Sequence, residues 1–147
     1  MREVAFPEGL SSIAPNCFFD SGIVAVCIPS TVSAIGKSAF ENCGNLETVT
    51  FESGSSLRQI EDQVFVKCKK LKNINLPEGL VDIGIQSFCD TGFKEIKIPK
   101  TVQVIQKSAF ESCIYLENIN FAEGSVLKTV GDSALFKCSK LHNIELP

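Results

Sequence analysis

The chain repeats one pattern of apolar and polar positions every 22 to 25 residues. Each unit contains a V/L-x-x-I phrase, then A-F-x-x-C, then L-x-x-I-x followed by an apolar residue. The clearest copy reads Val32–Ile35, Ala39–Cys43 and Leu46–Phe51. The last phrase ends in strict alternation of apolar and polar residues, which predicts a strand with one buried face. Thr48 and Thr50 then lie on the outer face.

The same alternation predicts seven parallel strands, which stacking would place about 4.8 Å apart. They are Met1–Phe6, Ile23–Ile28, Leu46–Phe51, Leu71–Leu76, Phe93–Ile98, Leu116–Phe121 and Leu141–Leu146. Proline follows five of them and ends each strand, because it cannot donate a hydrogen bond to a ladder. The A-F-x-x-C phrase is too short for a full helix. It predicts a single helical or 3₁₀ turn that buries the Phe and the Cys.

The repeat has two levels. Residues 7–76 and 77–146 are identical at 33 of 70 positions, which indicates a tandem duplication. Each block divides into three units, and the six units start at Pro7, Pro29, Glu52, Pro77, Pro99 and Ala122. A period in the low twenties is typical of leucine-rich repeat solenoids. We therefore predict one domain over residues 1–147, a right-handed leucine-rich repeat solenoid of about seven coils, mainly parallel sheet.

Composition excludes several classes of function. The net charge is −3 and no basic face stands out, so nucleic-acid binding has no electrostatic basis. No apolar run approaches the roughly 20 residues of a membrane helix. The chain has one histidine and no C-x-x-C pair, which predicts neither a metal nor a cofactor. The N-terminal sequence lacks the apolar segment of a signal peptide, so we expect an intracellular protein or a piece of a longer one.

Two Asp-Ser/Thr-Gly motifs resemble the active-site motifs of aspartic proteases. They are Asp20–Gly22 and Asp90–Gly92. That chemistry needs two carboxylates about 3 Å apart. Here the motifs lie in the same phase three coils apart, or roughly 14 Å at about 4.8 Å per coil. We interpret them as turns and predict no enzyme.

Four of the seven cysteines share one core position. Cys43, Cys68, Cys113 and Cys138 are expected to be small buried hydrophobes. Adjacent coils are close enough for a disulfide, but equivalent side chains in a parallel stack point the same way, which favours free thiols. Cys27 differs, because alternation places it on the outer face of its strand. It is either a tolerated surface residue or a thiol able to join two molecules.

The single histidine and a run of four lysines are the remaining candidates for catalysis or binding. His142 has no nucleophile fixed beside it by a motif, and we expect it to be solvated. Lys67, Lys69, Lys70 and Lys72 form a basic run around a core cysteine. This run is either a solvated face or a contact for an acidic glycan or protein.

The outward positions of the strands form the candidate binding face, since solenoids bind partners on such extended surfaces. The face has no Trp or Tyr to serve as an interface anchor. Its asparagines serve either as a binding surface or as a ladder that stabilises the sheet. The candidate residues are Thr48, Thr50, Asn73, Asn75, Glu95, Lys97, Asn118, Asn120, Asn143 and Glu145, preceded by Glu3, Ala5, Ala25 and Cys27.

The recurring A-F-x-x-C and L-x-x-I-x-I-P phrases, with a period near 23, resemble the BspA-like class of leucine-rich repeats. The resemblance covers nearly the whole chain. It implies a non-enzymatic protein-binding or adhesion module, located on the cell surface or secreted, whose partner is a host matrix protein or a cell-surface protein. The alternative, favoured by the missing signal segment, is an intracellular scaffold in the cytoplasm.

The two ends of the chain interrupt the repeat inside strand phrases. Terminal coils of solenoids normally carry polar caps, because a coil buries its apolar edge only against a neighbour. The last phrase instead carries Leu141, Ile144 and Leu146. Exposed strand edges recruit other chains, so we expect an end-to-end homodimer.

Overall fold

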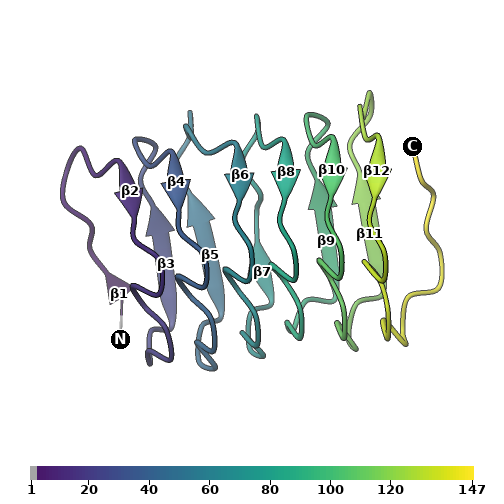
Figure 1. The fold of residues 1–147 in the computed structure, drawn as a ribbon, viewed down its shortest axis with the longest axis horizontal. Coiled ribbons are helices and arrows are strands. Elements are labelled where there is room, and N and C mark those ends of the chain that lie inside the picture. The colour runs from purple at the N-terminus through teal and green to yellow at the C-terminus, as the bar shows by residue number, and fades with distance from the viewer. Residues whose placement is uncertain (1–2) are drawn as a thin grey trace.

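The chain winds into a solenoid of about six turns, each of which contributes one short strand to each of two walls (Figure 1). The computed structural model describes residues 3–147; Met1 and Arg2, the start of the first expected strand, lie outside the described part. The first wall contains β1 (Glu3–Val4), β3 (Ala25–Ile28), β5 (Thr48–Phe51), β7 (Asn73–Ile74), β9 (Glu95–Ile98) and β11 (Asn118–Phe121). The second wall contains β2 (Ser12–Ile13), β4 (Ala34–Ile35), β6 (Gln59–Ile60), β8 (Asp82–Ile83), β10 (Val104–Ile105) and β12 (Thr129–Val130).

The first wall lies where the alternating phrases predicted it, and its strands are parallel. β1, β3, β5 and β7 form one ladder, and β9 and β11 form another. Val26 pairs with Val49, and Val49 pairs with Ile74, so equivalent apolar residues stack from coil to coil. The seventh expected strand is reduced to one bridge between Asn118 and Asn143. The predicted parallel-strand solenoid is therefore confirmed.

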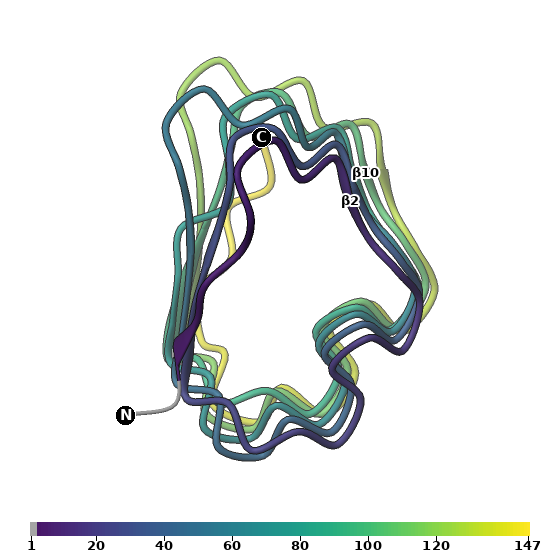
Figure 2. The same cartoon turned by 90° about the vertical axis from the view of Figure 1, so that its left-hand side faces the viewer.

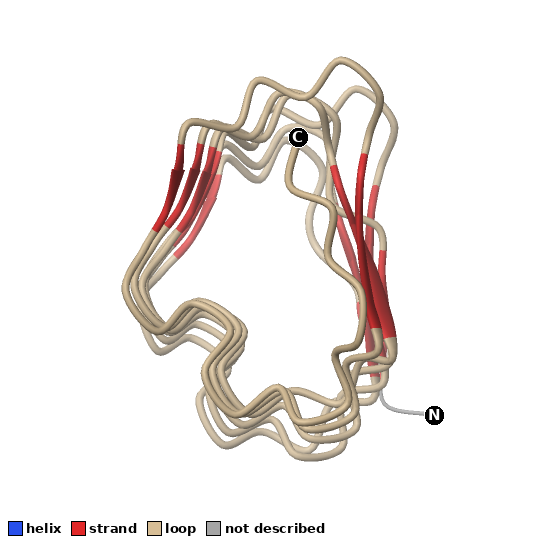
Figure 3. Ribbon diagram, turned by 90° about the vertical axis from the view of Figure 1, so that its right-hand side faces the viewer, coloured by secondary structure: helices blue, strands red, loops and turns tan. Residues whose placement is uncertain are grey.

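The second wall was not predicted. It is built by the V/L-x-x-I phrases, whose final isoleucines are buried at Ile13, Ile35, Ile60, Ile83 and Ile105. Each strand here has only two residues, too few for alternation to become visible in the sequence. Viewed along the solenoid axis, the two walls face each other and the turns close the coil between them (Figure 3). The coils superpose closely along both walls, and two of them bulge outward where the longer units cross between the walls (Figure 2).

The A-F-x-x-C phrases form successive turns, and the expectation of a helical or 3₁₀ turn was wrong. Residues with a left-handed backbone conformation recur four positions apart. The φ angle is 58° at Ser38 and 60° at Asn42. Alternate amides bond to the next coil: the Phe40 amide donates to the Val64 carbonyl over 3.0 Å. The amides between them close turns within the coil, as Glu41 does onto the Ser38 carbonyl over 3.2 Å. A helix cannot form because half of its donors are committed to the neighbouring coil.

The interior contains a column of phenylalanine rings. Neighbouring rings are nearly parallel, with centroids 5.1 to 5.5 Å apart and interplanar angles of 7° to 10°. This geometry is typical of offset stacking. The expected burial of the column's four central members is confirmed, and Phe18 extends the column at its N-terminal end. The four are Phe40, Phe65, Phe88 and Phe110.

Candidate functional site

The candidate binding face lies on the outside of the first wall. Of the ten candidate residues, Thr48 and Thr50 are partly buried and the other eight are exposed. The strand register brings equivalent residues side by side, with Thr48 beside Asn73 and Glu95 beside Asn118. The parallel ladders thereby gather polar side chains from distant parts of the sequence onto one surface. Cys27 is exposed on the same surface, as alternation predicted.

The first wall is interrupted between β7 and β9, since no ladder within residues 3–147 joins these two strands. On either side of the interruption the coils are bonded: the Lys72 amide donates to the Glu47 carbonyl over 3.1 Å, and the Glu117 amide donates to the Lys94 carbonyl over 2.8 Å. Among the described residues, the Lys94 amide has no matching bond to the preceding coil. Figure 1 shows β7 and β9 set further apart than their neighbours.

The interruption follows from a shortened turn. The segment 89–93 lacks one residue of the usual connection, and Gly92 passes close to the preceding coil. A Cβ atom at Gly92 would lie 2.3 Å from the Lys69 carbonyl oxygen, so only glycine fits there. Phe93, which replaces the usual leucine, is fully buried against Phe88 with ring centroids 5.5 Å apart. The coil is therefore recessed between two coils of normal length.

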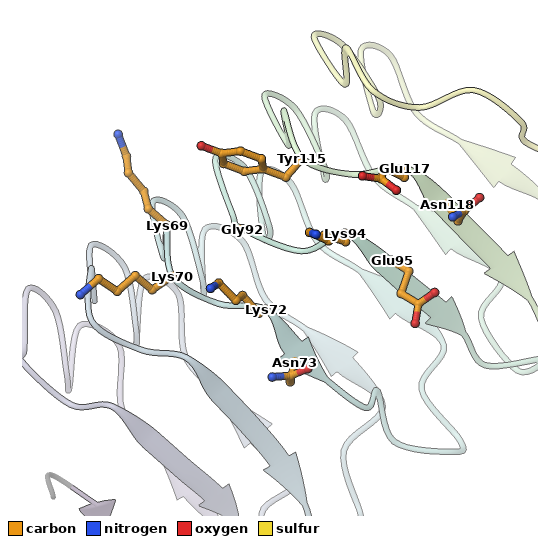
Figure 4. Close-up of a pocket in the computed structure, with 10 residues that line it drawn as sticks. All are labelled: Lys69, Lys70, Lys72, Asn73, Gly92, Lys94, Glu95, Tyr115, Glu117 and Asn118. Atoms are coloured by element: carbon orange, nitrogen blue, oxygen red, sulfur yellow. The ribbon is translucent and has the colours of Figure 1, made fainter.

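The recess opens a groove of about 800 Å³ at the edge of the first wall (Figure 4). Sites for small ligands typically occupy about 300–1,000 Å³, so the groove is large enough to hold several side chains. Three of the candidate face residues line it: Asn73, Glu95 and Asn118. The remaining lining residues are Lys69, Lys70, Lys72, Gly92, Lys94, Tyr115 and Glu117.

Positive charge dominates the groove. Four lysines line it against two glutamates. The Lys69 ammonium lies 3.4 Å from the Asp90 carboxylate, and the Lys70 ammonium donates to the Asn45 side chain over 3.0 Å. Within residues 3–147, Lys72 and Lys94 take part in no ion pair. Three of the four lysines of the basic run, all but Lys67, thus line one flank of a groove, together with Lys94, which was not among the predicted site residues.

Tyr115, the only tyrosine in the chain, forms the opposite flank (Figure 4). Its side chain is 48% exposed, and the Lys140 ammonium lies 5.4 Å from its ring centroid. This residue was not predicted, because it belongs to a turn rather than to the strand face. The signal that could have found it is the shortened unit 77–98, which places the groove beside this turn.

The two Asp-Ser/Thr-Gly motifs are turns, and their carboxylates have different neighbours. Asp20 accepts a hydrogen bond from the Asn42 amide over 2.7 Å, whereas Asp90 pairs with Lys69. Both aspartates have a left-handed backbone conformation, with a φ angle of 57°. The Thr91 hydroxyl donates to the Phe88 carbonyl over 2.8 Å. These contacts explain the motifs as elements of the shortened turns.

Three of the four core cysteines, Cys43, Cys68 and Cys113, are buried as expected, whereas Cys138, in the last coil, is only partly buried. Burial raises the pKa of the Cys43 and Cys68 thiols. A thiol held in its protonated form is a poor nucleophile and a poor metal ligand. Within the part of the chain that the structure describes, no three His, Cys, Asp or Glu side chains cluster as a metal site requires. His142 is exposed, as expected. No helix among residues 3–147 has the length and apolarity to cross a membrane.

The whole chain is similar to one family of repeat proteins. The family described as BspA type leucine rich repeat region (6 copies) matches residues 1–91 and 81–147. No curated protein matches the chain.

Crystal structures of bacterial leucine-rich repeat proteins have the same fold. One from Bacteroides ovatus has a TM-score of 0.75 at 33% identity, over 94% of this chain and 41% of its own. A leucine rich cell surface protein from Faecalibacterium prausnitzii has a TM-score of 0.76 at 31% identity, over 83% of this chain and 32% of its own. The chain therefore spans less than half the length of either. The T. pallidum leucine rich repeat protein shares the fold at 24% identity, with a TM-score of 0.72 over 96% of this chain and 78% of its own.

Proposed function

Because the chain belongs to the BspA-type leucine-rich repeat family, we propose that it is a non-enzymatic module that binds a protein partner through the outer face of its first wall. Leucine-rich repeat solenoids are typically binding scaffolds, with an extended sheet face as the binding surface. The observation that carries the proposal is the array of exposed polar side chains along that wall. Eight of the ten candidate residues are exposed, from Asn73 to Glu145.

The partner we propose is a host matrix protein or a protein of another cell, and the location is the cell surface or the extracellular space. One of the similar solved structures is described as a leucine rich cell surface protein, which supports that location. The partner surface should be polar, because the face offers amides, hydroxyls and charges. Such surfaces bind through hydrogen bonds and bridging water rather than through large apolar contacts.

The test is binding of the purified 147-residue chain to a panel of purified extracellular-matrix proteins, measured by biolayer interferometry. The informative variant is Asn118→Arg with Asn120→Arg, which places two bulky charges at exposed positions of β11. We expect it to weaken binding about tenfold or more, because a misplaced charge at an interface costs several kcal/mol.

The matched control is Gln59→Arg with Thr129→Arg, which adds the same charge at exposed positions of the second wall. Binding by this control should equal that of the parent chain. Equal losses in the two variants, or no binding to any protein of the panel, would refute the proposed face and partner class.

A further inference from the structure

We propose that the groove between β7 and β9 binds an extended, acidic peptide segment of the protein partner. This inference rests on the proposed function and adds the chemistry by which the partner is recognised. Three features of the groove support it: unpaired strand edges, an excess of lysine, and an aromatic flank. They meet at the one place where the first wall is interrupted.

The strand edges favour a peptide. β7 ends one ladder and β9 begins the next, so each presents main-chain groups that its neighbours use for pairing. The Lys94 amide is one of them, because the bond that the Glu117 amide makes in the following coil has no equivalent here among the described residues. Unpaired strand edges bind extended chains through main-chain hydrogen bonds. A peptide in the groove therefore offers a carbonyl group to the Lys94 amide.

The lysines favour acidic side chains. Lys72 and Lys94 come from adjacent coils and have no ion-pair partner within residues 3–147. An ammonium and a carboxylate form a charge-assisted hydrogen bond, which is stronger than a neutral one. Glu and Asp side chains on one side of the peptide would supply these carboxylates. The whole chain has a net charge of −3, so this attraction comes from the local excess of lysine and not from the charge of the whole chain.

The groove's own carboxylates favour a peptide over a sulfated glycan. Glu95 and Glu117 line the groove beside Lys94, on the side away from the other three lysines (Figure 4). A polyanion with charge on every side would meet them with repulsion. In an extended peptide, successive side chains point to opposite sides. Acidic residues at alternate positions therefore face the lysines, while neutral residues face the glutamates and Tyr115.

Tyr115 supplies an anchor that the strand face lacks. Tyrosine is enriched among the residues that contribute most to binding, since it offers a large rigid surface with little loss of entropy. The Lys140 ammonium lies over one face of the ring, 5.4 Å from its centroid. The flank thus fits the neutral side chains of the peptide.

The chain contains its own comparison, because the first 70-residue block has a similar shortened turn at Asp20–Gly22. There the positions equivalent to Lys94 and Tyr115 are Val24 and Asn45. The first shortened turn therefore lacks both the lysine and the tyrosine of the groove. Among the described residues, they come together where the lysine-rich end of the first block meets the shortened turn of the second.

The experiment measures fluorescence anisotropy of a labelled decapeptide of alternating Glu and Thr, titrated with the whole chain. The test variant is Lys72→Glu with Lys94→Glu. The control is Lys37→Glu with Lys107→Glu, which changes the charge equally at exposed positions outside the groove. We expect the test variant to weaken binding about tenfold or more and the control less than about twofold, since the effect of a charge depends on its distance from the ligand. A Gln-Thr decapeptide should not bind.

Two further measurements keep the inference falsifiable. Tyr115→Ala should weaken peptide binding with no change in the far-ultraviolet circular dichroism spectrum. An unlabelled peptide should displace the labelled one better than a heparin oligosaccharide of equal charge. No peptide binding, equal losses in the two double variants, or preference for heparin would each overturn the inference. If the chain still binds a matrix protein in any of these cases, the proposed function stands and only the role of the groove is refuted.

Discussion

The thiol of Cys68 donates a hydrogen bond to the carbonyl oxygen of Phe40, one coil earlier, over 3.1 Å. The other three core cysteines make the same contact with the preceding phenylalanine of the column, over 3.0 to 3.1 Å. This contact explains why Phe and Cys recur together in the A-F-x-x-C phrase. In the four units that have a core cysteine, the cysteine donates to the main-chain carbonyl group of the phenylalanine one coil earlier.

The first prediction concerns thiol reactivity. In the folded protein, Cys17 and Cys27 should react rapidly with Ellman's reagent, because both are exposed. The buried Cys43, Cys68 and Cys113 should react only as fast as the protein unfolds. Titration after denaturation without a reductant should then detect nearly all seven cysteines. Three thiols or fewer in that titration would show that the core cysteines form disulfides.

The second prediction concerns alkaline pH. Burial raises the pKa of Cys43 and Cys68 above the ordinary value of 9.0, so the folded state holds these protons more tightly than the unfolded state. Their contribution to stability is complete below pH 9 and is lost as the pH rises beyond it. The free energy of unfolding should therefore fall by up to about 1.4 kcal/mol per pH unit for each thiol.

Urea denaturation at pH 7 to 11 measures this dependence. Cys68→Ala should flatten the decline above pH 9, because one of the buried thiols has been removed. Cys27→Ala is the control and should leave the slope unchanged, since that thiol is exposed. An identical decline in all three proteins would show that other groups cause the alkaline loss of stability.

The sequence predicted the parts of the fold that rest on long regular phrases. Phrases that end in alternating residues, such as Leu46–Phe51, identify the strands of the first wall. The repeated phenylalanine identifies the buried column. The second wall escaped prediction because its strands have two residues each, as in Ala34–Ile35. The turns were misassigned because left-handed φ at Ser38 and Asn42 is not specified by residue type alone.

The groove escaped prediction for a different reason. It depends on a relation among three coils: Lys72 and Tyr115 come from the two outer coils, and Gly92 from the shortened turn between them. None of these residues is unusual within its own unit. Sequence repeats indicate which positions are equivalent in successive coils. The groove arises instead where neighbouring units differ in length.

The third prediction tests the phenylalanine column. Phe110 is fully buried and stacked on Phe88. Phe110→Ala should lower the free energy of unfolding by about 3–5 kcal/mol, through lost burial and the cavity that remains. Thermal denaturation measures this loss of stability as a fall in the melting temperature. Phe136→Ala is the matched control, since its ring is 53% exposed, and should cost far less. A melting temperature of Phe110→Ala close to that of the parent chain would contradict the assigned packing.

The fourth prediction is a stabilising substitution. The Ser87 hydroxyl is fully buried and finds no hydrogen-bond partner within residues 3–147. The equivalent residues in two other units are Ala39 and Ala109, both fully buried. Ser87→Ala should raise the free energy of unfolding by about 1 kcal/mol, because it removes an unsatisfied polar group from the core. Chemical denaturation measures the change, and Ser33→Ala, at an exposed position, serves as the control. A loss of stability in Ser87→Ala would mean that the hydroxyl is bonded in solution.

The last prediction is the end-to-end association expected from the repeat pattern. The final coil leaves one edge of β12 without a partner strand among the described residues. It also exposes several large apolar side chains, namely Val126, Val130, Phe136, Ile144 and Leu146. Burial of apolar surface of this kind contributes about 25 cal/mol per Å², and an unpaired strand edge adds main-chain hydrogen bonds. We therefore expect the 147-residue chain to self-associate through this coil.

Light scattering over a concentration series tests the association. The apparent mass should rise above 16 kDa as the concentration increases. Val130→Lys with Phe136→Lys should hold the mass near the monomer value, because two ammonium groups in the contact would have to be desolvated. Ile114→Lys, an exposed apolar residue on the side of the solenoid, is the control and should associate like the parent chain. If the mass stays at 16 kDa at millimolar concentration, the terminal coil is stable while exposed to water and the predicted association is wrong.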